Sequence, residues 1–443
     1  MGRLAGRGRG VKAMMRCNFG ARVQQGLFRG HAAGYGAGMT RITIDRLGHQ
    51  GDGIAEGPLF VPLALPGEVV EGTPHGQQLA DMRVITPSPS RVAPPCRHFK
   101  SCGGCQLQHA SDAFVAEWKV DVVRRALQAQ AIEAQFLPIH TSPPRSRRRM
   151  GISARRTKKG ALAGFHGRAS GVIVEIPECQ LIDPALQPAF DVAQRLAVLG
   201  ASRKAELAVQ ATLTRHGLDL AATGGKPLDG PLRVALAQLA EQCKLARLSW
   251  DGEVVATRLP PLQRMGLANV APPPGAFLQA TAAGEQALVH AVSDTVQGAA
   301  RVADLFSGCG TFALPLAQTA AVHAVEGDAE MLKALDRAWR ETPGLKRITT
   351  EARDLFRRPL MPDELRGVDA VVIDPPRAGA QAQVAQLALA SIGKIAFVSC
   401  NPVTFARDAK LLLDAGWRLG PVQVIDQFRW SAHIELVACF SRD

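Results

Sequence analysis

Two apolar runs near the end of the chain each stop at a polar, proline-containing loop. The first, residues 371–377, reads Val-Val-Ile-Asp-Pro-Pro-Arg, and the second, residues 397–402, reads Phe-Val-Ser-Cys-Asn-Pro. Short apolar runs that end abruptly are typical of strands buried on both faces of a parallel sheet. In such sheets, ligands bind at the carboxyl ends of the strands. We therefore expect Asp374, Arg377 and Cys400 to face one cleft.

Two residues near these runs each have two interpretations. A lone cysteine is commonly a small buried apolar residue, but the position of Cys400 at a strand tip, before Asn-Pro, favours a nucleophile. Glu435 stands between apolar residues in the last strand-like segment. An acid there is costly to bury unless it is paired or functional. The alternative for Glu435 is an exposed position on an edge strand.

The last third of the chain alternates strand and helix patterns. Strands are expected at residues 301–306, in a segment that ends near Glu326, and before Asp354, in addition to the two apolar runs. A helix is expected at residues 284–296. Alternation of this length predicts a doubly wound α/β sheet.

A glycine-rich turn, Ser-Gly-Cys-Gly-Thr at residues 307–311, follows the first of these strands. Glycines at this place let the backbone approach an adenosine-type ligand closely, and an acid after the second strand, here Glu326, takes the ribose hydroxyls. The turn lacks the third glycine of the dinucleotide fingerprint. These residues alone favour S-adenosylmethionine and leave a nicotinamide dinucleotide open.

The nine cysteines include three that are closely spaced, namely Cys96, Cys102 and Cys105. Thiolates at this spacing can converge on one metal centre, either an iron–sulfur cluster or zinc, and a chance group of structural cysteines is the other interpretation. A fourth ligand is needed, and Cys179 is the best candidate, although spacing alone does not select it. Cys243 lies in a helical run and is interpreted as a core thiol. An odd number of cysteines without a secretion signal favours a reducing cytoplasm over disulfides.

The formal net charge of +13 favours a polyanionic partner, most simply a nucleic acid, over a basic protein without such a partner. Residues 1–38 hold six Arg, one Lys and no acid, and we interpret them as a disordered tail. Residues 39–95 read as short strands, typical of a small β-barrel. Residues 145–159 contain eight Lys or Arg, which predict a basic β-hairpin that contacts nucleic-acid phosphates. The alternative is a charged face that is only solvated. No stretch approaches roughly 18 apolar residues, so no membrane span is predicted.

In combination, these segments resemble the bacterial 5-methyluridine RNA methyltransferases that carry a TRAM domain and an iron–sulfur cluster. The resemblance covers residues 39–443. It is carried by the following motifs: Pro-Ser-Arg-Val-Ala-Pro-Pro-Cys96 with Cys102-Gly-Gly-Cys105, Phe-Leu-Gln279, Asp-Leu-Phe306-Ser-Gly308-Cys-Gly310, Asp374-Pro-Pro-Arg377, Ser-Cys400-Asn-Pro and His-x-Glu435.

The resemblance implies a fold class and a division into domains. After the tail at 1–38, residues 39–95 are expected to form the TRAM β-barrel, an RNA-binding fold of the OB type. Residues 96–275 are expected to form an α+β central domain with the iron–sulfur cluster. Residues 276–443 are expected to form an α/β domain of class I, the Rossmann-like S-adenosylmethionine methyltransferases.

The resemblance also assigns site residues. It makes four cysteines the ligands of a [4Fe-4S] cluster: Cys96, Cys102, Cys105 and Cys179. It gives S-adenosyl-L-methionine these contacts, with Asp354 near the adenine: Gln279, Phe306, Thr311, Glu326, Asp354 and Asp374. The family commonly has Cys and Asn where Ser307 and Thr311 stand here, although the Thr hydroxyl can still form a hydrogen bond.

Carbon 5 of uracil is a poor nucleophile. The resemblance therefore implies that Cys400 activates the ring and that Glu435 acts as a base. Addition of the Cys400 thiolate to carbon 6 would give carbon 5 enolate character, and Glu435 would remove the carbon-5 proton after methylation. The target base must leave its stack to reach the cleft. Asp374 is expected to hold the uracil edge or the cofactor, and Arg377 to orient this loop or its neighbours.

The expected function is therefore formation of 5-methyluridine in RNA, with 23S ribosomal RNA favoured and the transfer RNA T-loop as the alternative. The competing classes are an amino-group or 5-methylcytidine methyltransferase and a non-catalytic RNA-binding or assembly protein. An amino-methylating enzyme needs no nucleophilic Cys400, and cytidine enzymes carry a cysteine in the fourth-strand motif, which Asp-Pro-Pro-Arg lacks. We expect a cytoplasmic monomer with no membrane contact and no obligate protein partner.

Overall fold

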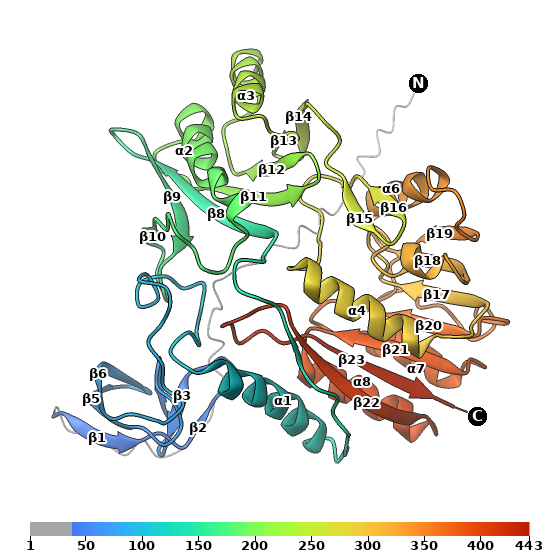
Figure 1. Cartoon of the computed structure of the whole chain (residues 1–443), viewed down its shortest axis with the longest axis horizontal. Coiled ribbons are helices and arrows are strands. Elements are labelled where there is room, and N and C mark those ends of the chain that lie inside the picture. The colour runs from blue at the N-terminus through green and yellow to red at the C-terminus, as the bar shows by residue number, and fades with distance from the viewer. Residues whose placement is uncertain (1–37, 443) are drawn as a thin grey trace, which may run out of the picture. The chain divides into compact units, whose positions relative to one another are not determined.

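A computed structural model describes residues 38–442, and within this part of the chain three larger sheets and one two-stranded hairpin form (Figure 1). The predicted basic tail, apart from its last residue, lies outside the described residues. No helix between residues 38 and 442 is both long and apolar enough to cross a membrane.

The first sheet contains the short strands that the sequence predicts between residues 39 and 95. Its order is β1-β5-β6-β4-β3-β2, and its pairs are antiparallel except where β4 meets β6. The strands are β1 (Thr40–Thr43), β2 (Arg46–Leu47), β3 (Gly53–Ala55), β4 (Leu59–Val61), β5 (Val69–His75) and β6 (Gln78–Thr86). Fully buried Glu68 holds the segment that follows β6, because its carboxylate pairs with Arg91 and accepts the Ser88 N–H at 3.1 Å.

The middle of the chain forms a seven-stranded sheet of order β10-β9-β8-β11-β12-β13-β14. The predicted basic hairpin is β8 and β9, which pair antiparallel with Ser153 opposite Gly164. The elements are β8 (Arg149–Arg156), β9 (Ala161–His166), β10 (Ile173–Val174), η1 (Pro184–Leu186), α2 (Pro188–Gly200), β11 (Leu207–Thr214), β12 (Gly217–Thr223), α3 (Gly230–Gln242), β13 (Arg247–Trp250) and β14 (Glu253–Thr257), followed by the hairpin of β15 (Gln263–Met265) and β16 (Ala268–Val270).

The C-terminal sheet has eight strands in the order β19-β18-β17-β20-β21-β23-β22-β7. Its first five strands are parallel, whereas β23 runs antiparallel to both β21 and β22. The elements are α4 (Ala282–Thr295), β17 (Arg301–Leu305), α5 (Ala313–Leu316), β18 (Ala321–Glu326), α6 (Ala329–Arg340), β19 (Ile348–Ala352), β20 (Ala370–Ile373), α7 (Gln381–Leu389), β21 (Lys394–Ser399), α8 (Pro402–Asp414), β22 (Arg418–Asp426) and β23 (Leu436–Ser441). The predicted doubly wound α/β sheet is confirmed.

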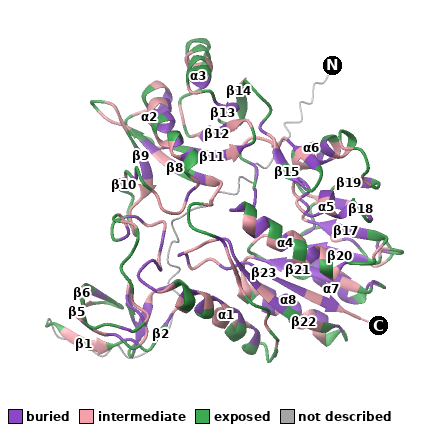
Figure 2. Ribbon diagram, in the orientation of Figure 1, coloured by how far each residue is buried: buried purple, intermediate pink, exposed green. Residues whose placement is uncertain are grey.

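The central strands β17, β20 and β21 are buried on both faces, as their apolar runs predict, whereas the edge strand β19 is largely exposed (Figure 2). Successive side chains of a strand point to opposite faces. Val371 and Ile373 accordingly belong to a core shared with α7 and α8, whereas Val372 belongs to a core shared with α4 and α6. The strand order reverses between β17 and β20, the place where such sheets form their ligand crevice.

Two elements of the predicted central domain join the C-terminal sheet instead. Helix α1 (Asp112–Gln128) begins at the cap Ser111 and buries Val123 and Leu127 in the core beside α8. Strand β7 (His140–Thr141) pairs parallel with β22 at the edge of the sheet. Sequence spacing does not reveal these long-range contacts. The domain boundaries at residues 95 and 275 therefore stay a prediction, and the core of the C-terminal sheet draws on residues before 275.

Candidate active site

The carboxyl edge of the C-terminal sheet brings the predicted catalytic residues together. Cys400 directly follows β21, Asp374 directly follows β20, and Glu435 directly precedes β23. The charges of Glu435 and Asp374 both raise the pKa of the Cys400 thiol, which requires the three side chains to be near neighbours. The exposed-edge interpretation of Glu435 is wrong, because β23 lies between β21 and β22 and the side chain is 3% exposed.

Cys400 is half-buried, and burial is the main reason that the pKa of its thiol is raised to about 12. The nearby carboxylates of Glu435 and Asp374 add to this effect, and the Arg377 guanidinium opposes it. The sequence identified no partner that lowers this pKa, and the structure supplies Arg377. In the free protein, the thiol is therefore mainly protonated near neutral pH.

The buried Glu435 carboxyl is held by an amide that the sequence analysis missed. Gln427 Nε2 donates a hydrogen bond to Glu435 Oε2 at 3.0 Å and a second to Gln279 Oε1. The Gln427 Oε1 accepts the Ala280 N–H at 2.7 Å. Burial first, and the charge of Asp374 second, raise the pKa of Glu435 to about 8. Gln427 directly follows β22, but that strand reads Arg-Leu-Gly-Pro-Val-Gln-Val-Ile-Asp and lacks the unbroken apolar run that marks Asp374 and Cys400.

The loop after β20 is tied to the loop after β21. The carbonyl oxygen of Arg377 accepts hydrogen bonds from Asn401 Nδ2 at 2.9 Å and from Thr404 Oγ1 at 3.3 Å. The Arg377 side chain contacts His433 Nδ1 at 2.5 Å. Burial, with the charge of Arg377 next, lowers the pKa of His433 to about 4, so the neutral ring can accept from the guanidinium. Burial, followed by the charge of Glu326, raises the pKa of Asp374 to about 7.

The glycine-rich turn after β17 closes onto Glu326 at the end of β18. Glu326 Oε2 accepts the Gly308 N–H at 3.1 Å, and Oε1 accepts the Asp328 N–H at 3.0 Å. Gly308 and Gly310 have positive φ angles of 54° and 95°, which glycine adopts without strain. A Cβ on Gly308 would meet only a sulfur at 3.9 Å, so the backbone there leaves room for a ligand. This cradle fits an adenosine-type group.

The remaining predicted cofactor contacts surround this turn. Phe306, whose φ is 62°, lies with its ring 5.5 Å from that of half-exposed Phe356. Asp354 is exposed, and its Oδ1 accepts the Phe356 N–H at 3.0 Å. Thr311 is half-buried at the start of the segment that leads into α5, and Gln279 is buried beside Gln427.

The predicted basic stretch divides between the interior and the surface. Arg148 is largely buried, donates to the Gln279 carbonyl at 3.1 Å and pairs with Glu285. Arg149 lies over the ring of Phe277, with Cζ 4.5 Å from the ring centroid, and Phe277 is 52% exposed. Its charge also acts on Glu435. An exposed aromatic ring beside an arginine whose charge reaches Glu435 is a surface suited to stacking a nucleobase.

The four predicted ligand cysteines lie near one another. Cys102 and Cys105 are buried, and Cys96 and Cys179 are half-buried. Burial is the main cause that raises the pKa of Cys105 to about 12, and the other three thiols each raise it further. Within residues 38–442, no group of three His, Cys, Asp or Glu is arranged to hold a single metal ion. Four thiols are the donor set that an iron–sulfur cluster takes, and the predicted cluster stays a prediction.

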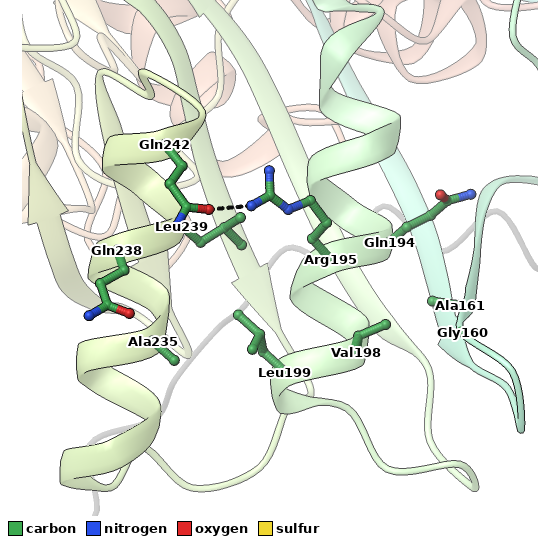
Figure 3. A pocket seen from close by; sticks show the side chains of 10 residues that line it. All are labelled: Gly160, Ala161, Gln194, Arg195, Val198, Leu199, Ala235, Gln238, Leu239 and Gln242. Carbon is green, nitrogen blue, oxygen red and sulfur yellow. Dashed lines mark hydrogen bonds between the residues drawn. The ribbon is translucent and has the colours of Figure 1, made fainter.

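A hollow of about 540 Å³ lies elsewhere, between α2 and α3 (Figure 3). Its lining is mainly small, apolar or amide side chains, and Arg195 donates a hydrogen bond to Gln242 there. None of the residues that the sequence marks as functional lines it. The chemistry-bearing residues lie instead at the edge of the C-terminal sheet.

Comparisons with known proteins show the family to which the chain is similar. The family described as tRNA (Uracil-5-)-methyltransferase matches residues 347–442. The chain is 45% identical over 415 residues to an uncharacterized RNA methyltransferase of Caulobacter vibrioides, with 91% of this chain and 100% of the relative covered. It is 33% identical over 436 residues to a 23S rRNA (uracil(1939)-C(5))-methyltransferase of Alkalilimnicola ehrlichii, with 91% and 96% covered.

Among solved structures, the fold is similar to that of the Pyrococcus abyssi tRNA (uracil-54, C5)-methyltransferase in complex with S-adenosyl-L-homocysteine. The TM-score is 0.71 at 23% identity, and the match covers 90% of this chain and 99% of the other. At this identity, the likeness concerns the fold.

The reactivity of Cys400 tests the electrostatics of the cleft. Glu435→Gln removes a negative charge that raises the thiol pKa, so we expect faster alkylation of Cys400 by iodoacetamide at pH 9, where Glu435 is mostly ionised. Each unit by which the pKa falls gives about tenfold more thiolate. The measurement is peptide mass spectrometry over time. Cys439 on β23 is the control, because Glu435 is not among the groups that shift its pKa. An unchanged or slower rate at Cys400 would contradict the proposed charge coupling.

Proposed function

The chain belongs to the RNA uracil-5-methyltransferases, and from that premise we propose that it forms 5-methyluridine in 23S ribosomal RNA through a covalent Cys400–uracil intermediate. The observation that carries this proposal is the convergence of Cys400, Glu435 and Asp374, whose charges act on one another at one sheet edge. The ribosomal substrate is supported by the relative from Alkalilimnicola ehrlichii, which is matched over nearly its whole length. Because the proposed substrate is RNA, we infer that the protein is cytoplasmic. We also infer that it is a monomer.

The methyl donor in this proposal is S-adenosyl-L-methionine, which supplies an activated methyl group and a positive sulfonium charge when bound. Glu326 is suited to the ribose hydroxyls, because its carboxylate is already oriented by the Gly308 and Asp328 N–H groups. Phe306 and Asp354 are suited to the adenine side, and Asp374 and Gln279 to the end near the methyl group. Thr311 completes the set.

The protein groups act in a fixed order. The Cys400 thiolate would add to carbon 6 of the uracil ring, and carbon 5 would then take the methyl group as the bond between that methyl and the donor sulfur breaks, which leaves a neutral thioether. Glu435 removes the carbon-5 proton, and the electrons of that C–H bond re-form the ring double bond as the sulfur leaves. A Glu435 pKa of about 8 suits proton removal near neutral pH. Arg377 lowers the pKa of Cys400 and so favours the thiolate.

Two other parts of the chain receive roles by proposal. The six-stranded sheet of residues 40–86 is the TRAM barrel, and with Arg149 and Phe277 it contacts RNA. The thiols of Cys96, Cys102, Cys105 and Cys179 hold a [4Fe-4S] cluster, for which their burial and mutual proximity are the support. No electron is exchanged in methyl transfer, so we assign the cluster a structural role at the RNA-binding surface.

The substrate is tested by mapping 5-methyluridine in RNA from a strain that lacks this gene. We expect one site in 23S ribosomal RNA to lose its methyl group, and the wild-type gene, but not Cys400→Ala, to restore it. Loss confined to the transfer RNA T-loop would replace the proposed substrate with the alternative. No loss in either RNA would favour a non-catalytic RNA-binding or assembly protein.

The covalent step is tested with RNA that carries 5-fluorouridine at the target position. Fluorine at carbon 5 cannot leave as a proton, so the enzyme should stall as an adduct joined through Cys400, visible as a shifted band on a denaturing gel. Adduct formation should require S-adenosyl-L-methionine, and Cys400→Ala should form none. Active, cofactor-loaded protein that yields no adduct would rule out the covalent mechanism.

The cluster is tested by chemical analysis of protein purified without oxygen. We expect about four iron and four sulfide per chain, and a loss of both in Cys96→Ser. RNA affinity should fall in the cluster-free protein, whereas affinity for S-adenosyl-L-methionine should persist because its proposed contacts lie elsewhere. Cys243→Ser, which changes a thiol outside the proposed ligand set, is the matched control. Unchanged RNA affinity after cluster loss would contradict the assigned role.

A further inference from the structure

A buried lysine in the first half of the chain reaches the segment that carries Glu435. Lys119 lies on α1 with no exposed side-chain surface, and its Nζ donates to Asp426 Oδ1 at 2.6 Å. It also donates to the carbonyl oxygens of Phe428 at 3.1 Å and His433 at 3.0 Å. All three ammonium protons thus have an acceptor. An ammonium group is rarely buried unless it is paired in this way.

The three acceptors span one loop, residues 427–435, between the end of β22 and the start of β23. Asp426 is the last residue of β22, and Phe428 and His433 lie near the two ends of the loop. Within this 427–435 loop, Gln427 Nε2 donates to Glu435 Oε2 at 3.0 Å, and His433 contacts the Arg377 guanidinium. One ammonium group therefore fixes the loop at the points from which its functional side chains project.

A second contact from the same face of α1 supports this arrangement. Asp112 stands seven residues before Lys119, which is two helical turns, so both side chains lie on one face of the helix. Asp112 pairs with Arg429, which directly follows Phe428 in the 427–435 loop. Arg429 also donates to the Ser142 carbonyl at 3.1 Å. The helix thus holds both ends of the loop through Lys119 and adds a contact in the first part of the loop through Asp112.

We propose that Lys119 is a positioning residue for the proposed methylation reaction, which acts through the 427–435 loop to place Glu435 for proton removal. The inference rests on the proposed function. Gln427 is the link, because its amide joins the loop to the Glu435 carboxylate. Lys119 itself donates to Asp426, Phe428 and His433 and contacts no reacting atom in this mechanism.

The test removes both charges of the pair, because removal of Lys119 alone would leave Asp426 buried without its cation. In Lys119→Met with Asp426→Asn, we expect a melting temperature within about 4 °C of wild type. We expect kcat to fall about a hundredfold, as small misplacements of catalytic groups produce, with little change in KM for either substrate. We also expect the covalent intermediate to accumulate on ordinary uridine RNA, because proton removal is the step that slows.

The matched control is Arg247→Met with Asp219→Asn, which removes a similarly buried pair between β12 and β13 at 2.6 Å whose two side chains bond to each other and not to the 427–435 loop. This control should accumulate no covalent intermediate and should leave amide exchange of residues 427–435 unchanged. Wild-type kcat in the Lys119 pair variant, or an activity loss without the trapped intermediate, would overturn the proposal. If the double variant fails to fold, Asp426→Asn alone should show the same changes at smaller size, and wild-type kinetics there would equally overturn it.

A readout independent of catalysis separates this inference from the proposed function. Amide hydrogen exchange of residues 427–435 should speed up in the Lys119 pair variant, whereas exchange in β20 should not change. Unchanged exchange in the loop would overturn the role of Lys119, whether or not the protein methylates RNA. Wild-type protein that forms no adduct on 5-fluorouridine RNA would instead overturn the covalent reaction. The exchange result would still show whether Lys119 holds the 427–435 loop in place.

Discussion

The hydrogen bonds of one amide, that of Gln427, join the parts of the cleft. Its Nε2 donates both to the buried Glu435 carboxylate and to Gln279, and its Oε1 accepts from the backbone of Ala280. A carboxylate that is almost fully buried and left without a partner costs about 1–3 kcal/mol or more. The position of Glu435 beside Cys400 depends on this amide, and the amide in turn depends on the loop that carries it.

The electrostatics of the cleft follow from the acids that it buries. Burial and mutual repulsion raise the pKa of Asp374 to about 7 and that of Glu435 to about 8, and they contribute to the high pKa of the Cys400 thiol. The positive charges of Arg377 and Arg149 lower the pKa of Glu435 but offset only part of this rise. Such a cleft favours a cation, and in the proposed reaction a sulfonium is the cation that enters it. The same burial keeps Glu435 basic enough to remove a proton near neutral pH.

Segments from the first half of the chain complete the C-terminal site. Helix α1 packs on the C-terminal sheet, and Lys119 binds the 427–435 loop. The cysteine segment touches the same loop, because the N–H groups of Gln106 and Leu107 donate to the Trp430 carbonyl at 2.8 and 3.0 Å. Trp430 also packs against Cys105. These contacts join the cysteine segment directly to the 427–435 loop.

The sequence by itself determined the doubly wound sheet, the strand tips that carry Asp374 and Cys400, and the glycine turn with its acid at Glu326. Each of these is a local pattern, because an apolar run followed by a polar residue marks a buried strand and its functional end. Only the tertiary structure decided that Glu435 is buried, that Gln427 holds it, and that α1 joins the C-terminal core. Those facts depend on contacts between residues as far apart as Lys119 and Asp426. No local pattern encodes such a pair, because each partner becomes buried only when the other segment packs against it.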